Sequence, residues 1–170
     1  MTLEELNRLP ADEARRALAR CCGAPAWAER LCAGRPFADR AALDRATADA
    51  FAALGPDDWR EAFAAHARIG DLESLRRKFA ATAEWAGEEQ RGAAAASEDT
   101  LAALADGNRA YEERFGYIFI VFATGKSAGE LLALLRARLA NDPATELRLA
   151  AEEQMKITRL RLDRMVDGAR

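Results

Sequence analysis

The sequence has few histidines and cysteines, the residues that bind transition metals or form disulfides. Among its 170 residues it has one histidine, His66, and three cysteines, Cys21, Cys22 and Cys32. The cysteines form no C-x-x-C pair and have no second histidine near them. Their odd number and the adjacent pair favour reduced thiols, which are typical of a cytoplasmic protein. We expect all three to be packing residues.

Long apolar runs and a strong net charge are also missing. No run approaches the roughly 18 apolar residues that cross a membrane. The first residues, MTLEE, carry acid early and lack a signal-like apolar segment. Charged residues make up 31% of the chain, yet the net charge is only −3, so no strong field attracts nucleic acid. We therefore expect neither a membrane nor a nucleic-acid partner.

Helical signals are present along almost the whole chain. Thr2 with Glu5, and Ser127 with Glu130, have the spacing of capping boxes, and Asp142-Pro143 is typical of a helix start. The length suits one domain with its own core. We expect an all-α, single-domain multi-helix bundle over residues 1–170. The helices are expected at about residues 3–9, 11–22, 25–33, 39–54, 57–66, 72–79, 84–96, 98–115, 128–140 and 143–166.

One apolar run interrupts this helical pattern. Residues 117–123, YIFIVFA, are aromatic and β-branched, and the run is too short for a free-standing helix. By period alone it is either a buried strand or the start of a buried helix. Because no partner strand is evident, we expect a short, buried, extended segment that leads into a helix. The TGKS that follows lacks the upstream glycine of a phosphate-binding loop, so we reject that function.

His66 is the only side chain whose unperturbed pKa lies near neutrality. It shares spacings of three and four with Trp59, Ala62 and Phe63, which places all four on one apolar helix face. The imidazole should therefore point into the protein near the end of that helix. From these residues alone, a structural core histidine and an acid–base catalyst both remain open.

Several short motifs occur in a fixed order along nearly the whole chain. They are WAER at 27–30, RPF at 35–37, AHARIG at 65–70, EQ at 89–90, Asn108 with YEERFG at 111–116, FIVFATG at 119–125, RLAN at 138–141, QMKI at 154–157 and LRL at 160–162. Each motif is weak alone, but together and in this order they resemble the family of 2-oxo-4-hydroxy-4-carboxy-5-ureidoimidazoline (OHCU) decarboxylases, which complete the conversion of urate to (S)-allantoin.

The resemblance implies a role for each matching position. His66 resembles the catalytic histidine and Glu89 its acidic partner. Arg161 resembles an arginine that faces the substrate. The other positions that match substrate-binding residues are Ala67, Ala86, Gly87, Glu88, Gln90, Phe119, Ile120, Val121, Phe122 and Ala123. The resemblance further implies a small-molecule substrate, a homodimer, and catalysis without metal or organic cofactor.

Three positions depart from the family pattern. Ala67 replaces a proline after the histidine, Ala86-Gly87 replaces a stretch that often contains serine, and Ile118 replaces a proline. The first two lie beside the expected site and put its rate and affinity in question.

Alternatives also remain for the individual residues and for the function. Without the resemblance, Glu89 fits an exposed helix acid and Arg161 a surface ion pair. The alternative functions are a lyase for another ureido or hydroxy-carboxylate substrate, and a non-catalytic helical interaction module.

Overall fold

The computed structural model describes residues 1–66, 72–85 and 98–166, and over these ranges it contains helices and irregular segments but no strand. The expected all-α class is confirmed. The chain divides into two compact units. The first unit comprises Met1–His66 and Ala151–Arg170, and the second comprises Ala67–Ala150.

The helices of the first unit begin within one residue of the expected positions. Its elements are α1 (Leu3–Arg8), α2 (Ala11–Ala19), α3 (Pro25–Ala33), α4 (Arg40–Ala52), α5 (Pro56–Ala64) and the part of α10 (Pro143–Val166) from residue 151 onward. Thr2 and Glu5 form the expected capping box. The second helix ends three residues before the expected Cys22, because the Cys21 and Cys22 amides both donate to the Leu18 carbonyl, at 2.8 and 3.3 Å.

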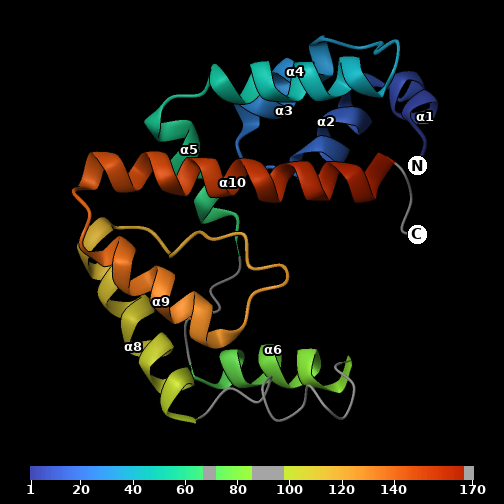
Figure 1. The fold of residues 1–170 in the computed structure, drawn as a ribbon. Helices are drawn as coiled ribbons and strands as arrows, with labels where there is room; N and C mark the ends of the chain where they lie inside the picture. The colour runs from blue at the N-terminus through green and yellow to red at the C-terminus, as the bar shows by residue number, and fades with distance from the viewer. Residues whose placement is uncertain (67–71, 86–97, 167–170) are drawn as a thin grey trace. The chain divides into compact units, whose positions relative to one another are not determined.

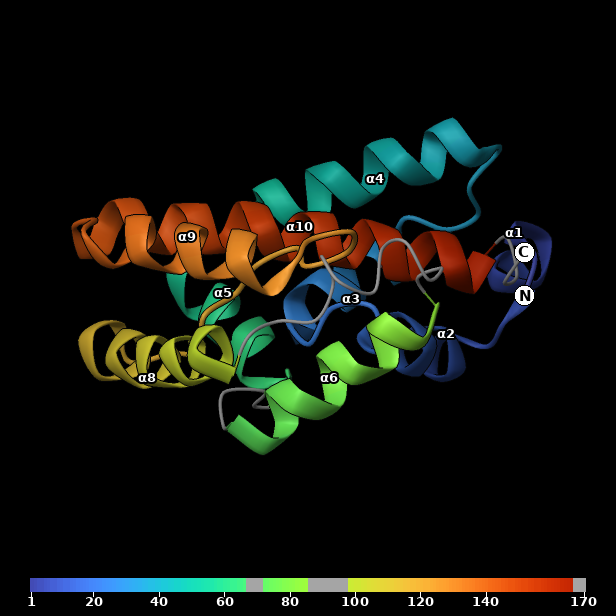
Figure 2. The same ribbon diagram turned by 60° about the horizontal axis from the view of Figure 1, so that its bottom comes forward.

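The core of the first unit is built from large apolar side chains that several helices contribute. α2 packs against α3, and α3 packs against α4 (Figures 1 and 2). An ion pair between Arg40 and Asp163 joins α4 to α10. The largest fully buried apolar side chains of this unit are Trp27, Phe63, Leu6, Leu18, Leu31, Leu43 and Leu162.

The second unit is organised around α8. It contains α6 (Leu72–Trp85), α8 (Glu98–Phe115), α9 (Ala128–Leu139) and the first part of α10, and α8 packs against both α6 and α9 (Figure 1). A Cβ atom on Gly107 of α8 would come within 2.6 Å of Leu135 in α9, so the absence of a side chain allows this close approach. The apolar core of the unit is formed by Leu75, Phe79, Leu101, Leu104, Ala105, Tyr111, Ala128, Leu131, Leu132 and Leu135.

The segment between α8 and α9 interrupts the helices, as expected, but it is only partly buried rather than buried throughout. Residues 117–123 have neither helical nor strand structure, and they lead to the Ser127–Glu130 capping box at the start of α9. Within the segment only Ile120 is fully buried, and the other six residues are half-buried. The run is therefore both a core contact and a partly accessible surface of the second unit.

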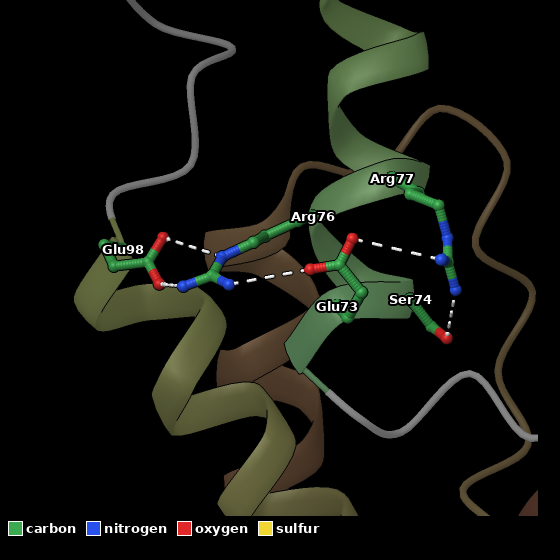
Figure 3. A network of polar contacts seen from close by, with 5 residues as sticks. All are labelled: Glu73, Ser74, Arg76, Arg77 and Glu98. Atoms are coloured by element: carbon green, nitrogen blue, oxygen red, sulfur yellow. Dashed lines mark hydrogen bonds and ion pairs between the residues drawn. The ribbon is translucent and has the colours of Figure 1, made fainter.

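A surface network connects the start of α6 with the start of α8 (Figure 3). Arg76 forms ion pairs with Glu98 and with Glu73, the latter at 3.7 Å, and Arg77 donates to the Ser74 hydroxyl at 3.2 Å. All of these charged side chains are exposed, so each pair adds little to the free energy of unfolding.

Two further observations concern the chain as a whole. Most of the helix expected at residues 84–96, and its neighbour Ser97, lie outside the described residues. Within the ranges that the structure describes, no helix has the length and apolar character that a membrane crossing requires.

Candidate functional site

His66 is positioned by the end of α5 and by a close contact with the chain after α2. The helix ends at Ala64, and the His66 amide donates to the Phe63 carbonyl at 3.1 Å. A Cβ atom on Gly23 would overlap the Cβ atom of Ala65, so only glycine lets the two segments approach this closely. The imidazole is half-buried, with apolar Ala62 and Phe63 anchoring the preceding turn in the core.

The two ring nitrogens of His66 contact two side chains of α10. Its Nε2 atom lies 2.6 Å from Oε1 of Gln154, and its Nδ1 atom lies 3.4 Å from Nη2 of Arg161. Gln154 is fully buried, and its amide nitrogen donates to the Thr158 hydroxyl at 3.1 Å. A purely structural histidine would need no partner beyond the buried Gln154. Here the second ring nitrogen also contacts the guanidinium of the half-buried Arg161.

These surroundings hold His66 in its neutral form. Burial lowers the pKa of His66, the hydrogen bond to the Gln154 side-chain oxygen opposes that shift, and the positive charge of Arg161 lowers the pKa further. A neutral imidazole with an available lone pair can act as a general base near neutral pH.

Arg161 is half-buried and contacts both the imidazole and the backbone after α2. Its Nη1 atom contacts the Cys21 carbonyl at 3.5 Å, while Nη2 approaches His66. A guanidinium held beside a base can bind a carboxylate through two parallel hydrogen bonds. Arg161 and His66 therefore lie together within the first unit.

The nearby thiols are poor candidates for a nucleophile. Burial raises the pKa of Cys21 to about 11, although Arg161 opposes the shift, and burial also raises the pKa of Cys22. Both therefore remain protonated near neutrality, when the thiolate is the reactive form. In the described part of the chain, no three or more His, Cys, Asp or Glu side chains are grouped so that they could hold a metal ion.

The apolar segment of the second unit is held by a buried polar network. Arg138 Nη1 donates to the Ile120 carbonyl at 2.6 Å, and Arg138 Nε donates to Glu146 Oε1 at 2.7 Å. Asn141 donates to the other Glu146 oxygen at 2.9 Å, and the Tyr111 hydroxyl also donates to this carboxylate. This network fixes the backbone at the centre of the predicted substrate-binding segment.

Contacts with aromatic rings extend this network to Phe119. The Arg138 guanidinium lies 4.7 Å from the Phe119 ring centre, and the Tyr111 and Phe119 rings meet edge-on at 5.1 Å. Burial raises the pKa of Tyr111, and its hydrogen bond to Glu146 raises it further, so this hydroxyl stays protonated and serves as a donor.

The predicted site residues fall into three groups. His66 and Arg161 lie together in the first unit, and the segment containing Phe119, Ile120, Val121, Phe122 and Ala123 belongs to the second unit. The remaining positions, Ala67, Ala86, Gly87, Glu88, Glu89 and Gln90, lie outside the described residues.

Sequence reasoning did not assign roles to Gln154, Thr158, Arg138 or Glu146. A signal existed for the first two, because Gln154, Thr158 and Arg161 follow one another at spacings of four and three, on one face of α10. For Arg138 and Glu146 the only signal was two opposite charges near a helix junction, which usually indicates a surface pair.

Comparison with known proteins gives one consistent result. The sequence model of the OHCU decarboxylase family matches residues 7–163. The uric acid degradation bifunctional protein TTL of Arabidopsis thaliana is 36% identical over 147 residues, covering 85% of this chain. This chain spans only 45% of that protein's length. The 2-oxo-4-hydroxy-4-carboxy-5-ureidoimidazoline decarboxylase of Amia calva is 32% identical over 143 residues, covering 84% of this chain and 81% of that protein.

A solved structure agrees with the sequence comparisons. The crystal structure of an OHCU decarboxylase in the presence of (S)-allantoin superposes with a TM-score of 0.69 and 34% sequence identity. The match covers 88% of this chain and 96% of that chain.

Proposed function

Because the chain belongs to the OHCU decarboxylase family, we propose that it decarboxylates 2-oxo-4-hydroxy-4-carboxy-5-ureidoimidazoline to (S)-allantoin. The observation that carries the proposal is the 3.4 Å approach of Arg161 Nη2 to His66 Nδ1. It places a general base beside a fixed cation, and this is the pair that an anionic substrate with a transferable proton requires.

The substrate explains why side chains alone can suffice. Its carboxylate is attached to a carbon that bears a hydroxyl and adjoins a ring C=N bond. When the carbon–carbon bond breaks and carbon dioxide leaves, the electron pair moves toward this C=N, which acts as the electron sink. The ring nitrogen of that bond takes up one proton from solvent. The former hydroxyl loses its proton and becomes a carbonyl, and one proton is added to the carbon of the former C=N bond. The protein has to orient the substrate and to move these protons.

We assign these tasks to residues as follows. Arg161 binds the anionic group, and His66 takes the hydroxyl proton and manages its return to carbon. Glu89 is proposed as the acidic partner of His66 on the basis of the family resemblance. Gln90, the positions Ala67, Ala86, Gly87 and Glu88, and the segment 119–123 are proposed to contact the substrate on the same basis.

The proposal extends to the state of the protein. The family match spans parts of both units, which supports treating residues 1–170 as one catalytic domain. The resemblance supports a homodimer that needs no cofactor, and the reduced, buried cysteines support a cytoplasmic location. Light scattering of the purified protein tests the dimer.

The test of the function uses the stereochemistry of the product. Urate oxidase and hydroxyisourate hydrolase form the unstable substrate in place, and this compound decays alone to racemic allantoin. Added protein should speed its loss and give a growing circular-dichroism signal of (S)-allantoin, because one bound orientation allows protonation of one face only. A racemic product at the unchanged spontaneous rate would refute the proposal and favour a related substrate or a non-catalytic module.

A further inference from the structure

The two nitrogens of His66 have unlike neighbours, which determines where its hydrogen lies. A guanidinium group has donors and no acceptor, so Arg161 can approach Nδ1 at 3.4 Å only if Nδ1 presents its lone pair. A neutral imidazole carries one hydrogen. That hydrogen must then be on Nε2, where it points at Gln154 Oε1 at 2.6 Å.

At its other end Gln154 has a partner that fits this orientation. Its amide nitrogen donates to the Thr158 hydroxyl at 3.1 Å, and both side chains are fully buried. If the amide were reversed, its NH₂ group would face the Nε2 hydrogen. Two hydrogen-bond donors would then oppose each other beside the fully buried Gln154 side chain. The Thr158 side chain also hydrogen-bonds Cys22, which completes a chain of partners from His66 into the core.

Few charged or titratable groups of the described residues face this imidazole. Arg161 of α10 is the cation that contacts the ring, and the thiols of Cys21 and Cys22, which lie near Arg161 and Thr158, stay neutral. A proton added at Nδ1 would therefore point at a guanidinium. Proton uptake becomes favourable only when an anion, such as a substrate carboxylate, lies beside Arg161 and offsets its charge.

We propose that Gln154, supported by Thr158, is a positioning residue that holds His66 in the Nε2–H tautomer, so that Nδ1 is the atom that receives the proton during catalysis. The assignment of a catalytic role to Nδ1 rests on the proposed function. The tautomer itself rests only on the contacts of His66. Gln154 touches the imidazole and not the reacting atoms, so its effect on the reaction passes through His66.

The tautomer can be observed directly, because His66 is the only histidine in the chain. In ¹⁵N-labelled protein without substrate, above the pH of its titration, long-range ¹H–¹⁵N spectra show one imidazole whose two nitrogens differ strongly in shift. We expect the protonated shift at Nε2 and the unprotonated shift at Nδ1. The reverse assignment, or two averaged shifts, would overturn the proposal without any assay of activity.

Variants test the role of Gln154 in the reaction. In Gln154→Glu a carboxylate faces the Nε2 hydrogen, so the acid limb of the kcat/KM profile should move up by about one to three pH units. The control is Arg159→Gln, which changes the net charge by the same amount at an exposed position of α10 and should leave the profile in place. A Gln154→Glu enzyme that loses rate without a shift in the pH midpoint has only lost packing, and this result contradicts the proposal.

A milder variant covers the case in which Gln154→Glu does not fold. Thr158→Val keeps the shape and removes the hydroxyl that orients the amide, so the two imidazole shifts should move toward each other. Unchanged shifts in this variant would remove Thr158 from the proposal. If the wild-type tautomer is as expected but the protein forms no (S)-allantoin, the proposed function fails and the tautomer assignment stands.

Discussion

The Nε2 atom of His66 lies 2.6 Å from the side-chain oxygen of Gln154, a residue 88 positions further along the chain. Gln154 is fully buried within α10, and the neighbouring Arg161 faces the opposite ring nitrogen. Gln154 therefore orients the imidazole through Nε2, and the lone pair of Nδ1 is available for proton transfer.

Replacement of His66 by alanine should abolish decarboxylation. Loss of a general acid–base group lowers a rate by about 10²- to 10⁴-fold, and no other histidine can substitute. The stereospecific assay measures the rate, and far-ultraviolet circular dichroism measures the helical content, which should be nearly unchanged. More than about a tenth of the wild-type rate would exclude His66 from the mechanism, and unfolding of the variant would instead indicate a structural histidine.

Arg161→Met should weaken substrate binding more than it lowers kcat. A hydrogen bond to a charged group contributes about 1.5 to 3 kcal/mol, so KM should rise by roughly 10- to 150-fold. Arg159→Met is the matched control, because it removes the same charge from an exposed position two residues earlier in α10. Equal kinetics of the two variants would mean that Arg161 does not bind the substrate.

Glu89→Gln tests the residue that the family resemblance pairs with His66. The substitution keeps the shape of the side chain and removes its charge, so kcat should fall more than KM changes. A variant of Glu88, its neighbour in sequence, provides the comparison. If Glu88→Gln has the larger effect on kcat, the assignment has to move by one position.

The buried pair in the second unit should respond strongly to the loss of one partner. Arg138→Met leaves the fully buried Glu146 without its cation, which typically lowers the free energy of unfolding by about 3–5 kcal/mol. The double variant Arg138→Met, Glu146→Leu removes both charges and should be more stable than the single variant. Urea unfolding measures both, and additive effects of the two substitutions would show that the pair is not coupled.

Stability should decrease when the solution becomes mildly acidic. Burial and Arg161 hold the pKa of His66 below the value of about 6.5 that it has when unfolded. Between the two pKa values the unfolded chain binds a proton at His66 and the folded chain does not. The contribution of His66 to the free energy of unfolding is therefore complete above about pH 6.5 and is lost as the pH falls through the folded pKa. Urea midpoints between pH 5 and 8 should show this slope, and His66→Gln should show less of it.

Local sequence signals determined most of the secondary structure. The Thr2–Glu5 and Ser127–Glu130 boxes and the Asp142 cap act over three residues, so their partners are always within reach, and each begins a helix where expected. The helix α2 ends three residues earlier than its sequence predicts, because its end depends on how the Cys21 and Cys22 amides turn back to Leu18.

For the site, too, the sequence specifies the residues, and the tertiary structure specifies their contacts. Residue types and motif order determined the family and named His66 and Arg161, since chemistry and chain order are written in the sequence. Only the tertiary structure decided that Gln154 faces Nε2 and Arg161 faces Nδ1, and that Arg138 and Glu146 form a buried pair which holds Ile120. These contacts join separate elements, and a side chain's partner across the core depends on packing that no local spacing specifies.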